Sequence, residues 1–109
     1  MEALERLLRL WFGYVPEILP VARALEAAAV NGDEGGVAWR DRMGDLRELF
    51  AGAVARLERD GRLAEGWTVP AAADWVWARA QPSTFSLLVG DYTERAVRSV
   101  LSEVVSPPA

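Results

Sequence analysis

The feature that most constrains the fold is the helical spacing of apolar residues, which continues along nearly the whole chain of 109 residues. From Leu4 to Val15, apolar side chains follow the i, i+3, i+4, i+7 rule of an amphipathic helix, and charged residues occupy the opposite face. No segment alternates apolar and polar residues for long enough to be a strand. The pattern predicts an all-α fold, a bundle of five or six helices.

Glycine and proline mark the expected helix boundaries in the first half of the chain. Gly13 and Pro16 are expected to end the first helix, because proline lacks the N–H that a helix interior requires. Pro16 also suits the first turn of a second helix, which we expect to run to about Val30. The longest helix is expected over residues 34–60, and Gly61 has the position of a left-handed C-terminal cap.

Similar signals divide the second half. Thr68 is expected to cap a fourth helix, and that helix should end at Gln81, because the residue before a proline avoids helical geometry. A short helix is expected over residues 84–90. Thr93 is expected to cap the last helix, which carries an apolar stripe of mainly β-branched residues.

Length and composition bound the possible functions. We expect a single domain over residues 1–105 and a flexible tail over 106–109. The chain has neither cysteine nor histidine, which excludes disulfides, thiol chemistry, a zinc site of ordinary ligand type and a histidine-based triad. The chain has a net charge of −4, so it does not have the excess of basic residues that is expected of a nucleic-acid-binding protein. Without a bilayer-length apolar run or a signal-peptide cleavage pattern, the chain is expected to be cytoplasmic.

The segment from Val69 to Gln81 carries only two charged residues and is apolar on all sides. Trp75 and Trp77 project about 200° apart on a helix, so one intramolecular core cannot easily bury both. We therefore expect a homodimer in which this helix and the last one form a four-helix bundle with their copies. The alternative is a helix at the centre of a monomeric bundle. The residues expected at the dimer interface are Val76, Trp77, Ala80, Val97, Val100, Leu101 and Val104.

The stretch GRLAEGWTVPAAADWVWARAQPSTFSLLVGDYTERAVRSVL (residues 61–101) resembles the C-terminal regulatory half of TetR-family transcriptional regulators. The matching motifs are Gly61-Arg62-Leu63, Ala72-Ala73-Asp74, Trp77-Ala78, Pro82-Ser83, Leu87-Leu88-Val89-Gly90 and the last helix. The loop before the last helix is shorter than is usual in the family. The family's N-terminal helix-turn-helix domain has no counterpart in this chain.

The resemblance implies an effector-sensing and dimerisation domain of a TetR-like repressor. Such a domain binds a small hydrophobic or aromatic molecule, pairs with a second copy and acts on DNA only through an N-terminal domain. The second hypothesis is a structural α-helical homodimerisation module with no ligand. A cavity between the helices would distinguish them, because a purely structural module should be filled.

Large aromatic side chains with few polar groups are typical of a small-molecule cavity. The residues expected to bind the ligand are Trp11, Phe12, Tyr14, Trp39, Met43, Phe50, Trp75 and Arg79. Each of these aromatic residues could instead belong to a plain core. Arg79 would favour a carboxylate or phosphate on the ligand, unless it forms a salt bridge, for example with Asp74.

A catalytic role has little support, and we expect no catalytic residue, metal or cofactor. Asp41, Asp45 and Glu48 recur at helical spacing, and paired carboxylates can do acid–base chemistry or bind a hard cation. However, arginines surround this row, and such a row is usually a solvated face with local ion pairs. A small helical enzyme is therefore only a third hypothesis.

Overall fold

The computed structural model describes residues 1–82 and 92–107, apart from the side chains of Tyr92 and Thr93. Within this part the chain forms four helices and no named strand, which confirms the predicted all-α class. The helices are α1 (Glu2–Val30), α2 (Glu34–Arg59), α3 (Val69–Arg79) and α5 (Tyr92–Val104). The short helix expected over residues 84–90 lies outside the described residues.

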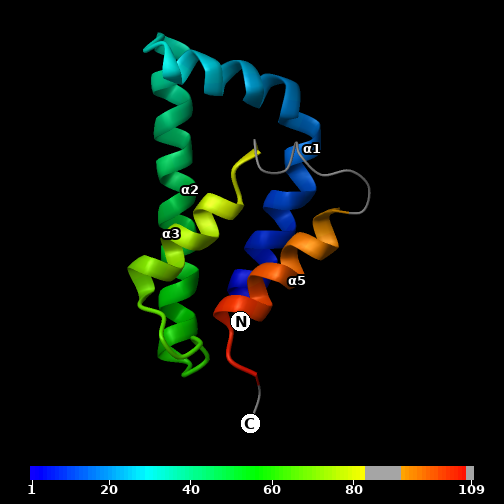
Figure 1. Cartoon of the computed structure of the whole chain (residues 1–109), viewed down its shortest axis with the longest axis vertical. Coiled ribbons are helices and arrows are strands. Elements are labelled where there is room, and N and C mark those ends of the chain that lie inside the picture. Colours follow the sequence, from blue (N-terminus) through cyan, green and yellow to red (C-terminus); the bar gives the residue numbers. More distant parts are fainter. Residues whose placement is uncertain (83–91, 108–109) are drawn as a thin grey trace.

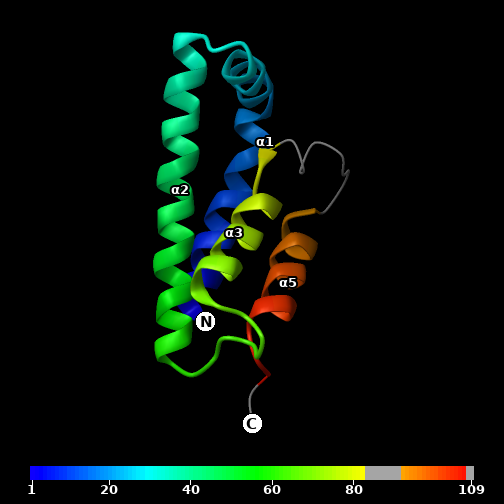
Figure 2. The same ribbon diagram turned by 60° about the vertical axis from the view of Figure 1, so that its left-hand side comes forward.

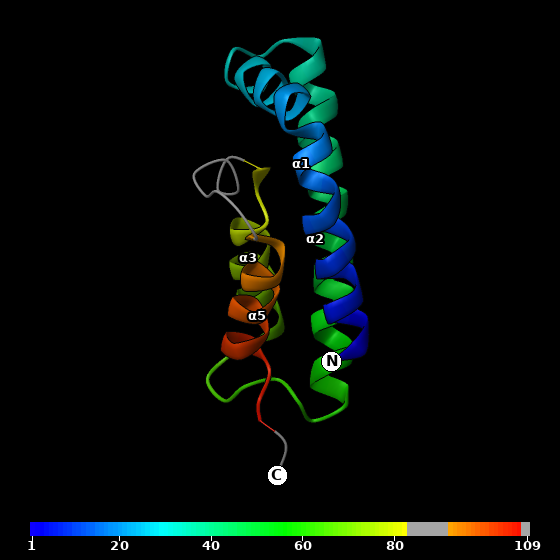
Figure 3. The ribbon, with the colours of Figure 1, turned by 90° about the vertical axis from the view of Figure 1, so that its right-hand side faces the viewer.

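The helices pack in two layers (Figure 1). The antiparallel helices α1 and α2 form one layer, and α3 and α5 lie side by side on it as the second (Figure 3). The shortest dimension of the molecule, 19 Å, is about two helix diameters. The connected end of the α1–α2 hairpin extends beyond α3 and α5 (Figure 2). Each layer therefore has one face toward the core and one toward solvent.

Helix α1 corrects the prediction of two separate N-terminal helices. It is one helix from Glu2 to Val30 that contains Pro16 and Pro20, and this merger accounts for the smaller number of helices in the described part. The helix is bent in its middle, and its second half crosses over the beginning of α2 (Figure 1). Prolines remove backbone N–H groups and crowd the preceding turn, which bends a helix when the packing on both sides keeps it helical.

The turn between α1 and α2 brings the two backbones into direct contact. Gly32 has a left-handed φ of 74°, and the N–H groups of Gly32 and Asp33 donate to the last carbonyls of α1. At Gly36, a Cβ would lie 2.3 Å from the Cα of Ala29, so only glycine fits there. Nη2 of Arg40 donates to the carbonyl of Ala29 over 2.8 Å and covers the end of α1.

Helix α2 ends at Arg59, and Gly61 has the left-handed conformation predicted for a C-terminal cap, with a φ of 71°. The N–H of Arg62 donates to the carbonyl of Leu57 over 2.9 Å, the pattern of a Schellman cap. The next residues pair with the end of the chain through an antiparallel bridge between Leu63 and Val105. The guanidinium of Arg62 also donates to the carbonyl of Ser106 over 2.9 Å. The first residue of the expected tail is thus held against the fold.

Helix α3 begins at the cap predicted from the sequence. The hydroxyl oxygen of Thr68 accepts a hydrogen bond from the N–H of Ala71 over 3.3 Å. The helix ends at Arg79, two residues before the predicted end at Gln81. Helix α5 begins at Tyr92, so the predicted cap residue Thr93 is already inside the helix, and its side chain lies outside the described part.

The core lies between the two layers and is made by all four described helices. Helices α1 and α2 contribute mainly leucines and phenylalanines to this core. Helices α3 and α5 contribute mainly alanines and valines, which pack against them. The fully buried members include Leu4, Leu8, Phe12, Phe50, Val54, Leu57, Ala72, Val76, Val97, Val100 and Val104. The β-branched stripe of α5 therefore faces inward.

This packing removes the reason for placing a dimer interface on α3 and α5. Five of the seven residues expected there are buried in the core of a single chain: Val76, Ala80, Val97, Val100 and Val104. The other two, Trp77 and Leu101, are partly buried and pack against the same core. The prediction overlooked that α3 lies between α2 and α5, so its two apolar sides meet two different neighbours of the same chain.

We predict that Gly36→Ala destabilises the protein by about 1–3 kcal/mol, because the added methyl group forces the α1 and α2 backbones apart. Gly52→Ala is the matched control. It lies on the same helix with nothing within 4 Å of its added Cβ, so it should stabilise the helix by up to about 1 kcal/mol. Urea unfolding of the two variants measures both effects. Equal stability of the two would show that the backbone contact at Gly36 does not constrain the fold.

An ion-pair cluster joins α1 to α5. The guanidinium of Arg9 pairs with the carboxylate of Glu94, which also accepts a hydrogen bond from Arg98 over 3.3 Å. The hydrogen bond from Arg9 lowers the pKa of Glu94 below its ordinary value of 4.5, and the charges of Arg9 and Arg98 act in the same direction. The cluster is partly exposed, so salt screens it.

We predict that this cluster contributes stability above pH 4.5 and that the contribution is lost as the pH falls through the lowered pKa of Glu94. Glu94→Gln should therefore be less stable than the wild type at neutral pH, and the difference should shrink in acid. Urea unfolding between neutral and acidic pH measures it, with Glu103→Gln as a control, since Glu103 forms no ion pair within the described part. A stability difference that stays constant with pH would contradict the assignment.

Candidate functional site

An open apolar groove of about 630 Å³ lies between α1 and α2. Its volume is in the range of small-molecule sites. Most of the lining side chains are aliphatic or aromatic. They are Leu7, Leu10, Trp11, Tyr14, Ile18, Val21, Ala22 and Leu25 from α1, and Trp39, Arg42, Met43, Asp45, Leu46 and Leu49 from α2.

The bend of α1 explains why the groove exists. The lining residues of α1 extend from Leu7 to Leu25 and therefore span both Pro16 and Pro20. A straight pair of helices would interlock their side chains along the whole length. Here the second half of α1 turns toward the beginning of α2 and reaches the contact at Gly36 (Figure 1), and a groove is left open between the two helices around the bend.

Four of the eight residues expected to bind a ligand line this groove: Trp11, Tyr14, Trp39 and Met43. Trp11 is held in place by its indole N–H, which donates to the carbonyl of Ala80 over 2.6 Å. The rings of Trp11 and Tyr14 lie 6.4 Å apart between centroids, at an angle of 54°. Met43 is buried, and Trp39 is partly exposed.

The other four expected ligand residues lie elsewhere, which corrects the prediction of a single pocket. Phe12 and Phe50 are fully buried in the core, because they lie on the faces of α1 and α2 that α3 and α5 cover. Trp75 and Arg79 lie on α3, where the guanidinium stacks 5.0 Å from the centre of the indole ring. Arg79 also donates to the hydroxyl of Ser99 on α5 and does not pair with Asp74.

The sequence interpretation missed the aliphatic half of the groove, although a signal was present. Leu7, Leu10, Tyr14, Ile18, Val21 and Leu25 are separated by 3, 4, 4, 3 and 4 residues, which is helical spacing. This stripe continues through both prolines. It therefore indicated one continuous helix with a second apolar face, whereas Pro16 was interpreted as a boundary between two helices.

The charges in the groove neutralise each other. Among the described residues, Arg42 and Asp45 are the only charged ones in its lining, and they pair over 3.2 Å at its edge with both side chains largely exposed. The other polar side-chain groups of the described lining are the hydroxyl of Tyr14 and the indole N–H groups of Trp39 and Trp11. The indole N–H of Trp11 already donates a hydrogen bond to the carbonyl of Ala80. The groove therefore suits an uncharged ligand with an apolar body.

The acidic row on α2 forms no cation site in the described part of the chain. Asp45 pairs with Arg42, and Glu48 pairs with Arg47 over 3.2 Å. No group of three or more acidic side chains there is arranged to hold a metal ion. The row is a solvated face with local ion pairs, the more ordinary of the two interpretations of the sequence.

Comparisons with known proteins found no matching family model, no similar curated protein and no similar solved structure. The TetR resemblance therefore depends on the sequence motifs alone. Among the described helices, none combines the length and apolar character needed to cross a bilayer.

We predict that replacing both prolines, Pro16→Ala with Pro20→Ala, straightens α1 and removes the groove. The chain has no cysteine, so Arg6→Cys and Ala24→Cys introduce the only two sites for spin labels. The distance between the labels should lengthen toward the roughly 27 Å of a straight helix of that length. Labels at Asp41→Cys and Glu58→Cys on α2 should report no change. If the distance between the two labels on α1 did not change, tertiary packing and not the prolines would impose the bend.

Proposed function

We propose that this chain is an effector-sensing domain of a TetR-like regulator and that its effector is a small, uncharged, apolar molecule bound in the groove between α1 and α2. The observation that carries the proposal is the groove itself, an apolar hollow of about 630 Å³ in which the two charged residues of the described lining, Arg42 and Asp45, pair with each other. The link to TetR regulators is supported by the motifs between residues 61 and 101.

Hydrogen bonds from groove-lining residues to α3 support a sensing mechanism. The indole of Trp11 donates to the carbonyl of Ala80 at the end of α3, and the carbonyl of Met43 accepts from the indole of Trp77 on α3. A ligand that displaces Trp11 or Met43 would therefore act directly on α3. It would favour the arrangement of helices to which it binds more tightly. In a complete regulator, an N-terminal DNA-binding domain would respond to that shift.

The second candidate is a homodimerisation module that uses the same groove. The observation that favours it is the exposure of apolar residues at the rim, where Leu10 is 67%, Val21 is 61% and Leu49 is 58% exposed. Contiguous exposed apolar surface is typical of protein interfaces. In this alternative, a helix of a second copy covers the groove and no small molecule enters.

We predict that the neutral fluorescent probe N-phenyl-1-naphthylamine binds this protein and that Leu49→Asp weakens its binding at least about tenfold, because a carboxylate then borders the apolar site. Val37→Asp is the matched control, since Val37 is an exposed apolar residue of the same helix outside the groove. A fluorescence titration measures both.

The molecular mass in solution, measured by light scattering, separates the two candidates. A monomer that binds the probe supports the ligand site. A dimer that Leu49→Asp dissociates, and that does not bind the probe, supports the homodimer. Equal probe affinities of Leu49→Asp and Val37→Asp would contradict binding in the groove.

A further inference from the structure

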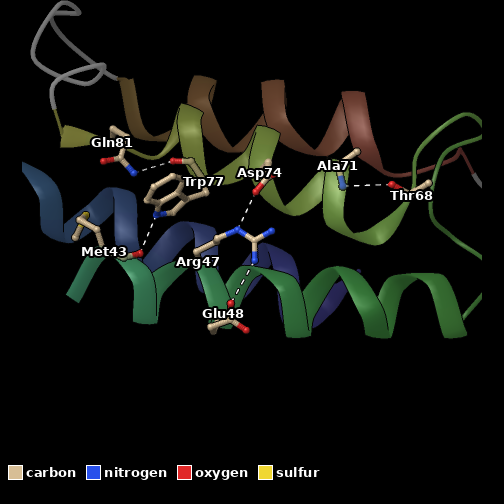
Figure 4. A network of polar contacts seen from close by, with 8 residues as sticks. All are labelled: Met43, Arg47, Glu48, Thr68, Ala71, Asp74, Trp77 and Gln81. Atoms are coloured by element: carbon tan, nitrogen blue, oxygen red, sulfur yellow. Dashed lines mark hydrogen bonds and ion pairs between the residues drawn. The ribbon is translucent and has the colours of Figure 1, made fainter. Parts of the chain in front are cut away.

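A second hollow, of about 330 Å³, lies where α2 faces the end of α3 (Figure 4). Its lining combines two tryptophans with two arginines and an amide, whereas the groove is lined mainly by aliphatic side chains. Its lining residues are Ala29, Trp39, Arg40, Met43, Gly44, Arg47, Trp77 and Gln81.

The second hollow and the groove lie on opposite flanks of α2, on either side of Trp39 and Met43. Arg40 and Arg47 line the second hollow, whereas Arg42 lines the groove. Consecutive residues of a helix are rotated by about 100°, so Arg40 and Arg42 project from opposite flanks. Trp39 and Met43 line both spaces and form the wall between them. The two spaces can therefore hold different ligands.

The aromatic wall of the second hollow is fixed by hydrogen bonds. The indole N–H of Trp77 donates to the carbonyl of Met43 over 2.8 Å. The side-chain amide of Gln81 donates to the carbonyl of Trp77 over 3.0 Å. The first of these bonds holds the indole ring of Trp77 between α2 and α3, and the second holds the side chain of Gln81 against the end of α3, so the hollow has one rigid, flat side before any ligand binds.

The two arginines of the second hollow differ in how their charges are balanced. Nε of Arg47 pairs with Asp74 over 2.8 Å and Nη1 pairs with Glu48, so two carboxylates offset its charge (Figure 4). Arg40 has no carboxylate within ion-pair distance in the described part of the chain. Its one hydrogen bond there is from Nη2 to the carbonyl of Ala29. The remaining N–H groups of Arg40 and its positive charge are available to a ligand.

We propose that the second hollow binds a planar aromatic carboxylate. The ring of the ligand would pack between the indoles of Trp39 and Trp77, and its carboxylate would accept hydrogen bonds from the guanidinium of Arg40. A guanidinium has the planar geometry that binds a carboxylate through two parallel hydrogen bonds. The volume of the second hollow suits a ligand of one or two fused rings. The positive charge of Arg40 favours an anionic ligand there, whereas the groove favours an uncharged one.

The test compares 2-naphthoate with 2-naphthamide, which share a ring system and differ in charge. We expect calorimetry to give at least about tenfold tighter binding of the carboxylate, because hydrogen bonds to a charged group are the stronger kind. The five tryptophans provide five indole N–H signals in a nitrogen-15 spectrum. Naphthoate should move the signals of Trp39 and Trp77 and leave that of Trp67 in place, with each signal assigned by a Trp→Phe variant.

Arg40→Gln should remove the preference for naphthoate over naphthamide, and its matched control Arg42→Gln should keep it. Because Arg40 also covers the end of α1, Arg40→Lys is included, and it should retain part of the preference through its charge. Leu49→Asp should leave naphthoate binding unchanged while it weakens the neutral probe, which separates this proposal from the proposed function of the groove.

Three results would overturn the proposal. The first is equal affinity of the wild-type protein for naphthoate and naphthamide. The second is an equal loss of preference in Arg40→Gln and Arg42→Gln. The third is movement of the Trp11 signal without that of Trp77, which would place the acid in the groove.

Discussion

The contact between the backbone of Gly36 and the last turn of α1 is the constraint on which the rest of the arrangement depends. It fixes where the two longest helices meet at their connected end, while large core residues such as Leu8 and Phe50 hold the layer together at the other end. Between these two points, the prolines of α1 bend the helix away from a straight path. The groove is the space that this geometry leaves. A close contact at one end of a bent helix is therefore accompanied by an open apolar groove along its middle.

The tryptophans connect this first layer to the second one. The indole N–H groups of Trp11, Trp67 and Trp77 each donate to a backbone carbonyl of a different segment, at Ala80, Glu103 and Met43 respectively. A partly buried indole needs such a partner, and it also contributes a large apolar area. Two of these bonds begin or end at residues that line the groove, so residues that hold α3 in place also form the wall of the groove.

Local signals were the most reliable part of the sequence interpretation. The caps at Thr68 and Gly61 and the extent of α2 followed from the chemistry of a few neighbouring residues, and the structure confirms them. The boundary at Pro16 was wrong, because its effect depends on whether tertiary packing on both sides of the proline keeps the helix formed. Of the residues expected to bind a ligand, Trp11, Tyr14, Trp39 and Met43 line the groove, but large apolar character alone could not separate them from Phe12 and Phe50. Both sets have the same chemistry, and only the position of α3 and α5 decides which set is covered.

The sequence by itself determined that this chain is helical, that it lacks histidine and thiol chemistry, and where several of its helices begin and end. These properties depend on residue types and on hydrogen bonds within a few positions. Only the tertiary structure decided that the apolar sides of α3 meet α2 and α5 of the same chain, and that the unfilled apolar surface lies on the other layer, between α1 and α2. The physical reason is that apolar burial has no direction of its own. An apolar stripe requires a cover, and the path of the whole chain determines which helix supplies it.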